Sequence, residues 1–143
     1  MLSTFILRPL PIEQQRPLAP GIQYFRSVRT EPRRLIIHAI QVDLTSPDIG
    51  FLVTPGDPKA EQPLQARTVA KFLSDYNMLV AVNGDGFTPW RSNSILDFYP
   101  HSGDYVTPLG FAASQGKDYA KGVEDEVTLY IAKDNQVSFN EPM

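Results

Sequence analysis

The chain contains no cysteine, which excludes disulfide bonds and metal sites built from thiolates. No apolar run approaches the length of about 20 residues that crosses a bilayer as a helix, so no membrane span is predicted. The net charge is −3 and no run of lysine and arginine is present in the sequence. Both observations argue against nucleic acid and anionic membrane surfaces as partners, because such binding depends on neutralising phosphates.

Histidine is scarce as well, with two copies, whereas proline and glycine are frequent, with thirteen and nine. This balance predicts short elements joined by turns, and 42% hydrophobic residues suffice for one domain with a real core. Residues 1–20 are interpreted as a proline-rich leader or linker, and residues 21–143 as the domain. The apolar stretch near the start is short and closed by Arg8, so it does not qualify as a signal peptide.

Alternating apolar and polar residues predict an antiparallel meander of three strands, over residues 22–27, 35–44 and 49–54. By the period-2 rule, His38 shares the apolar face of the second strand with Ile36, Ile40 and Val42. We therefore expect His38 to be buried in the sheet as a core residue and to lie outside any site.

The spacing of Val69, Phe72, Leu73 and Tyr76 predicts an amphipathic helix on the sheet, with Thr68 as its N-cap and Asn77 at its end. Residues 78–82 follow as a buried strand. Further on, we expect a loop over residues 91–94, a short strand or irregular aromatic segment over 95–99, and a strand over 109–114. A turn over 115–117, a polar connection over 119–125, and a final hairpin of residues 127–132 and 137–139 should follow. The fold class is therefore α+β, a mostly antiparallel sheet with one main helix packed on a face.

The stretch after the 78–82 strand contains the candidate site. Asn83 and Asp85 are the polar side chains at the strand end, and we predict that they are catalytic. Gly84 and Gly86 allow backbone N–H groups to approach a ligand, and Phe87 and Trp90 suit the apolar face of a sugar. The alternative is a simple hairpin turn, because Asn-Gly and Asp-Gly are preferred in tight turns.

The sequence resembles the phosphodiester glycosidase family, which includes enzymes that remove N-acetylglucosamine from a phosphodiester and exopolysaccharide-associated relatives. The most specific match is the Ala-Val-Asn-Gly-x-Gly-Phe pattern that ends at Phe87. Residues 37–44, 51–55 and 109–116 are similar to the family as well. The resemblance implies hydrolysis of a sugar-1-phosphodiester in a glycan or exopolysaccharide, without a cofactor and in an extracytoplasmic setting.

The chemistry of that bond needs donors for the departing phosphate, for which Arg67 and Arg91 are the candidates. Tyr99 and His101 complete the predicted substrate-binding residues. Glycosidases usually place two carboxylates across the bond, and Asp97 or Asp104 could supply the second beside Asp85.

Two other functions stay open. A carbohydrate-binding module would use Phe87, Trp90, Phe98 and Tyr99 to hold glycans without cleaving them. A metal-dependent hydrolase would draw ligands from Asn83, Asp85, Asp97 and His101, although their spacing fits no metal motif.

The resemblance covers only the first part of the family's domain, since the glycine-rich motif of its later part has no counterpart here. We therefore expect an incomplete domain that is nearly inactive as it stands. Exposed apolar side chains and an unpaired sheet edge should then favour self-association.

Overall fold

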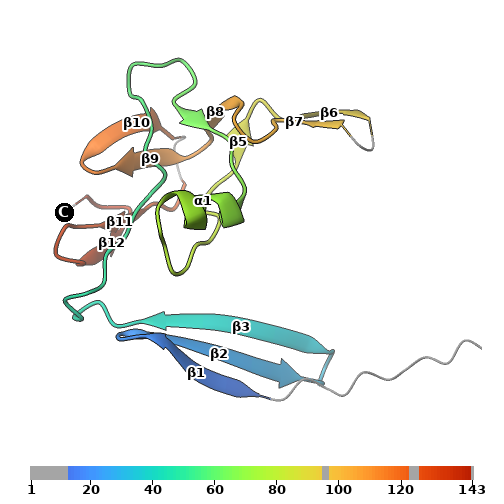
Figure 1. Ribbon diagram of the computed structural model, residues 1–143, viewed down its shortest axis with the longest axis vertical. Helices are drawn as coiled ribbons and strands as arrows, with labels where there is room; N and C mark the ends of the chain where they lie inside the picture. The colour runs from blue at the N-terminus through green and yellow to red at the C-terminus, as the bar shows by residue number, and fades with distance from the viewer. Residues whose placement is uncertain (1–12, 95–96, 123–125, 143) are drawn as a thin grey trace, which may run out of the picture. The chain divides into compact units, whose positions relative to one another are not determined.

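The computed structural model describes residues 13–94, 97–122 and 126–142. The chain divides into two compact units, Met1–Gly50 with Lys133–Gln136, and Phe51–Ala132 with Val137–Met143. The strands pair antiparallel in each unit and the described residues contain one helix, which confirms the α+β class (Figure 1). Among these residues the strands form five small sheets instead of one continuous sheet.

The first unit is a three-stranded meander of β1 (Gln14–Ala19), β2 (Ile22–Arg29) and β3 (Leu35–Val42), with β2 in the centre (Figure 1). The prediction of a leader over residues 1–20 is wrong for Gln14–Ala19, which form β1. Pro20 and Gly21 explain the difference, because they turn the chain tightly between the two strands and Gly21 adopts a φ of 75°. Residues 1–12 of the predicted leader lie outside the described residues.

His38 is exposed, so the prediction that it is a buried core residue is wrong. Its neighbours on the same face explain this: Ile36 and Ile40 are themselves 43% and 41% exposed. Among the described residues, no apolar layer covers this face of β3. The imidazole Nδ1 of His38 lies 2.7 Å from the hydroxyl oxygen of Tyr24 on the neighbouring strand.

The predicted third strand over residues 49–54 is also wrong. Three carbonyls of this stretch accept hydrogen bonds from side chains instead of a neighbouring strand, and the first of them is Ile49 O, which accepts from the Asn135 amide at 2.9 Å. The Ser114 hydroxyl donates to Val53 O at 2.7 Å, and the Tyr119 hydroxyl donates to Thr54 O at 2.6 Å. Side-chain donors thus take the place of ladder hydrogen bonds here.

The helix is confirmed as α1 (Val69–Asp75) in the second unit. The Lys71 N–H donates to Thr68 Oγ1 at 3.1 Å, as expected of an N-cap. Asn77 adopts a φ of 50°, and the Met78 N–H donates to Leu73 O at 2.9 Å, which ends the helix in a Schellman motif. No residue of α1 is fully buried, and Phe72 and Leu73 on its apolar side are half-buried.

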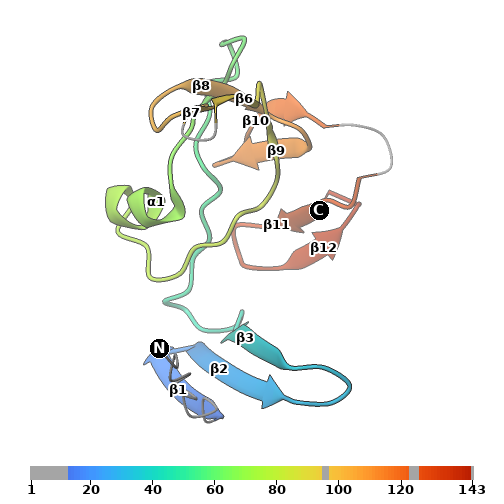
Figure 2. The same ribbon diagram turned by 90° about the vertical axis from the view of Figure 1, so that its right-hand side faces the viewer.

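The central sheet of the second unit has the order β4 (Leu64–Gln65), β8 (Tyr105–Pro108), β5 (Phe87–Thr88). Three hairpins accompany it among the described residues (Figure 2): β6 (Arg91–Ser94) with β7 (Asp97–Tyr99), β9 (Phe111–Ser114) with β10 (Lys117–Lys121), and β11 (Leu129–Ile131) with β12 (Val137–Phe139).

The final hairpin is confirmed, and β9 with the turn after it confirms the strand predicted over residues 109–114, two residues shorter at its start. β6 was predicted to be a loop, and β10 occupies part of the predicted polar connection, so both of these predictions are wrong. Residues 95–96 and 123–125 of the predicted segments lie outside the described residues.

The strand predicted over residues 78–82, directly before the candidate site, is absent from the described structure. Leu79 is 55% and Val82 83% exposed, and the stretch pairs with no described strand. The expected core is small as well, since Val106 on β8 and Pro63 are the only apolar side chains buried in the described residues. In the same residues, no helix is long and apolar enough to cross a membrane.

Candidate functional site

A cavity of about 150 Å³ in the second unit is lined by Arg67, Phe87 and His101, three of the residues predicted to bind substrate. They come from the segment before α1, from β5 and from the loop before β8. The other lining residues are Ala66, Thr68, Pro100 and Ser102.

Backbone hydrogen bonds around Ala66 hold two of these segments together. The Ala66 N–H donates to Asp104 O at 2.8 Å, and the Gly103 N–H donates to Ala66 O at 2.8 Å. These bonds fix the loop of His101 against the segment of Arg67.

Arg67 is held in place by the helix that follows it. Its Nη1 donates to Asp75 Oδ2 and to the Tyr76 hydroxyl, both at 3.2 Å, and its guanidinium lies 5.3 Å from the centre of the Tyr76 ring. Lys71 Nζ contacts the second oxygen of Asp75 at 2.8 Å. The Arg67 side chain is 18% exposed, and its buried Nε has no hydrogen-bond partner among the described residues.

His101 lies between two carboxylates. Its Nε2 is 3.6 Å from Asp97 Oδ1 and its Nδ1 is 3.5 Å from Asp104 Oδ2, while its backbone N–H donates to Asp104 at 2.8 Å. The ring distances are longer than hydrogen bonds, and the His101 side chain is 67% exposed. The two carboxylates proposed as partners of Asp85 are thus both brought to His101.

Arg91 and Tyr99 are opposite each other on the β6–β7 hairpin, where the guanidinium lies 4.9 Å from the ring centre. Neither residue lines the Arg67 cavity. Trp90 precedes β6 and is 64% exposed. Arg91 therefore forms a cation–π pair with Tyr99 on this hairpin, and it does not join Arg67, the other predicted phosphate donor, in the cavity.

Asp85 is engaged in holding loops together. One oxygen accepts the Gly86 N–H at 2.6 Å, and the other accepts the N–H of Gly110. Asn83 and Gly84 are exposed, and Gly86 O accepts a hydrogen bond from Leu109 at 3.1 Å. The predicted shared cleft of Asn83 and Asp85 does not appear in either cavity described here, because the strand expected to present these residues is not formed.

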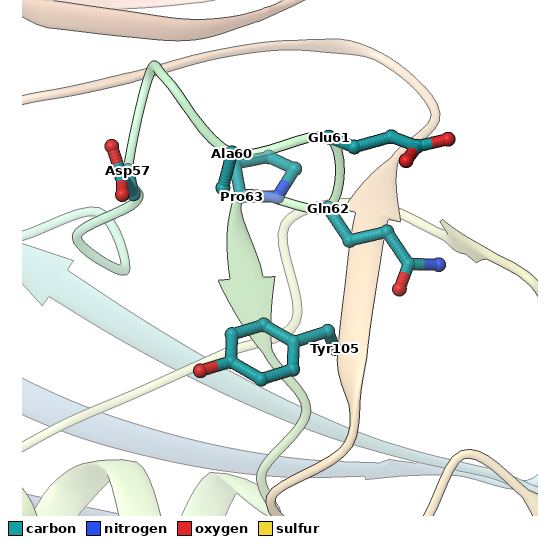
Figure 3. A pocket seen from close by; sticks show the side chains of 6 residues that line it. All are labelled: Asp57, Ala60, Glu61, Gln62, Pro63 and Tyr105. Atoms are coloured by element: carbon teal, nitrogen blue, oxygen red, sulfur yellow. The ribbon is translucent and has the colours of Figure 1, made fainter.

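A second cavity of about 420 Å³ lies next to β4 and β8 and is lined by Asp57, Ala60, Glu61, Gln62, Pro63 and Tyr105. Figure 3 shows the carboxylates of Asp57 and Glu61 pointing away from each other, on opposite sides of Pro63. They do not form a catalytic pair. No sequence motif indicates this cavity, because Tyr105 follows Pro63 by 42 residues in the chain.

The described residues contain no group of three or more His, Asp or Glu side chains arranged to hold a metal ion. Of the ligands considered for a metal-dependent hydrolase, Asp97 and His101 are a close pair, whereas Asp85 is engaged with backbone N–H groups. No family model, curated protein or solved structure matches the chain. The resemblance to phosphodiester glycosidases therefore stays a prediction from the sequence.

Proposed function

We propose that the chain is a hydrolase of sugar-1-phosphodiesters and that the cavity between Arg67, Phe87 and His101 holds the phosphate end of the substrate. The convergence of these three residues in one cavity carries the proposal. Pockets that enclose a whole small molecule have volumes of about 300–1,000 Å³. A cavity of about 150 Å³ suits a terminal group instead of a complete glycan.

The Arg67 side of the cavity suits the phosphate. Arg67 and Lys71 share one carboxylate, that of Asp75, so this cluster has one positive charge in excess. Fixed positive charge stabilises the negative charge that develops on a departing phosphate. Phe87 supplies an apolar wall for the C–H face of the sugar.

The His101 side of the cavity suits the activation of water. In the proposed step, His101 takes a proton from a water molecule while the water oxygen bonds to the anomeric carbon. The bond between that carbon and the phosphate oxygen breaks, and the phosphate leaves with the electron pair. Asp97 and Asp104 stabilise the imidazolium and the positive charge that develops on the sugar.

Because the sequence predicts low activity for the chain as it stands, the test measures both the slow release of N-acetylglucosamine from UDP-N-acetylglucosamine, by chromatography, and the saturable binding of this substrate to the purified chain. We expect His101→Gln to lower kcat by about 100-fold, because it removes the general base. Arg67→Gln should raise KM, since it removes the phosphate donor. Lys117→Gln is the control, because it removes one positive charge from an exposed residue of β10 outside the cavity.

Thermal unfolding of each variant separates a lost function from a lost fold. Turnover in a folded His101→Gln variant that equals wild-type turnover would contradict the assigned base. Absence of both turnover and saturable binding in the wild-type chain would overturn the proposal itself.

A second candidate is glycan binding without cleavage, and the cavity beside Tyr105 favours it. Its volume of about 420 Å³ lies within the small-molecule range. Tyr105 is 55% exposed, and Gln62 and Glu61, which line the same cavity, supply hydrogen-bonding groups. Saturable oligosaccharide binding that is lost in Tyr105→Ala, with no product released, would select this function.

We also propose that the chain self-associates through the outer edge of β3. Leu35–Val42 contains no Asp, Glu, Lys or Arg, and its Ile36, Ile37 and Ile40 side chains are 43%, 40% and 41% exposed. Two copies paired antiparallel about Ala39 would bring Ile36 opposite Val42 of the second copy and Ile37 opposite its Gln41, with no like charges opposed. Light scattering over a concentration series should show a dimer that Ile37→Lys dissociates and that the exposed-site control Val127→Lys retains. A monomer at all concentrations would contradict this proposal.

A further inference from the structure

One face of the β1–β2–β3 sheet brings together cationic and aromatic side chains from all three strands. Residues paired directly across antiparallel strands share a face. The observed register therefore forms two adjacent rows on this face, one of Arg16, Tyr24 and Ile40 and the other of Gln14, Arg26 and His38. We call these six residues the basic face.

The side chains at the centre of the basic face are held by one another. The Arg16 guanidinium lies 5.3 Å from the centre of the Tyr24 ring, and the Tyr24 hydroxyl oxygen is 2.7 Å from His38 Nδ1. Arg16 and His38 are nevertheless exposed. An exposed guanidinium stacked on a ring loses less conformational freedom when it binds an anion than a free one would.

The charge of this part of the chain is opposite to that of the whole. Residues 13–42 contain five arginines and two glutamates, a net charge of +3, whereas the complete chain has a net charge of −3. Neither glutamate belongs to the basic face. Glu13 accepts a hydrogen bond from Ser27 on the opposite face, and Glu31 lies between β2 and β3.

We propose that the basic face binds an anionic polysaccharide, with Arg16 as its main contact to the phosphate or sulfate groups. Arg26 has an interaction of its own within the protein, so the proposal does not depend on it. Tyr24 and Ile40, which is 41% exposed, offer apolar surface to the C–H faces of sugar rings. The choice of a glycan over another polyanion rests on the proposed function, since the net charge of −3 opposes the long-range attraction of every polyanion alike.

The test compares binding of the full chain to dextran sulfate and to unsulfated dextran of the same length. We expect binding to dextran sulfate alone, and an Arg16→Gln variant should bind about threefold more weakly. Its slope of log Kd against log salt should fall by about 0.7–0.9, the change expected for one lost anion contact. Arg29→Gln is the matched control, because it removes the same charge from an exposed β2 residue on the opposite face.

Three results would overturn the proposal: no binding by the wild-type chain, an equal loss in the Arg16 and Arg29 variants, or tighter binding to a single-stranded oligonucleotide than to dextran sulfate. Two variants distinguish a failure of polysaccharide binding from a failure of the proposed hydrolase activity. His101→Gln should retain dextran sulfate binding, and Arg16→Gln should retain turnover of UDP-N-acetylglucosamine.

Discussion

The carboxylate of Asp85 accepts a hydrogen bond from the backbone N–H of Gly110, which lies 25 residues later in the chain. The second carboxylate oxygen accepts the N–H of Gly86. Asp85 thus joins the segment that precedes β5 to the segment that precedes β9. A residue selected from the sequence for catalysis is here placed to hold two loops together.

Replacing Asp85 by Ala should lower the free energy of unfolding by about 1–3 kcal/mol, because the part-buried Gly110 N–H would lose its charged acceptor. Urea denaturation measures the change. The exposed neighbour Asn83, changed to Ala, is the control and should alter stability by less than about 0.5 kcal/mol. An Asp85→Ala variant of normal stability that has lost turnover would show that Asp85 acts on the substrate instead.

Replacing Gly56 by Ala should destabilise the second unit by about 1–3 kcal/mol through overpacking. A Cβ at position 56 would lie 2.6 Å from Cγ of the Tyr119 ring, and the Tyr119 hydroxyl is tied to Thr54 O. The ring therefore cannot easily move away. Gly84→Ala is the control, because nothing lies within 4 Å of a Cβ there, and thermal unfolding of the two variants should differ clearly.

Stability should decrease at alkaline pH because of Tyr119. Burial raises the pKa of its phenol above the ordinary value of 10.0, so the folded protein holds this proton more tightly than the unfolded chain. The stabilisation is complete below pH 10 and is lost as the pH rises through the pKa of the folded state. Urea denaturation at pH 8 and pH 11 should show a smaller decrease for Tyr119→Phe than for the wild type. An identical decrease would contradict the assignment to Tyr119.

Replacing Thr68 by Ala should cost about 1 kcal/mol, because α1 would lose the acceptor for the Lys71 N–H. Thr68→Ser retains the hydroxyl and should recover most of that stability. Circular dichroism during denaturation measures both variants. Equal stability of Thr68→Ala and wild type would show that the cap contributes nothing to this short helix.

The sequence predicted those features whose physical cause lies within a few residues. Thr68 caps the start of α1 by accepting a hydrogen bond from its first turn, and Asn77 closes the end of the helix by donating one to its last turn. Gln115 and Gly116 form the two-residue turn between β9 and β10 with φ values of 53° and 73°. Pro20 and Gly21 carried a turn signal of the same kind, which could have identified β1 before the structure did.

The sequence predicted the individual residues of the candidate site, but it did not predict which of them lie together in one cavity. Arg67, Phe87 and His101 were each selected from the sequence, yet only the backbone hydrogen bonds around Ala66 bring the first and last together. Asp75 and Tyr76, which orient Arg67, were not selected, because the sequence alone does not show that the guanidinium turns toward the helix.

The sequence by itself determined the α+β class, the ends of the helix and the turns of two hairpins, because capping groups and positive-φ residues act over a few residues. The tertiary structure alone decided which apolar segments became strands. Residues 49–54 and 78–82 have strand-like sequences, but a strand exists only where a neighbouring backbone supplies its hydrogen bonds. In this protein the Ser114 and Tyr119 hydroxyls hold the first of these segments, and no described strand pairs with the second.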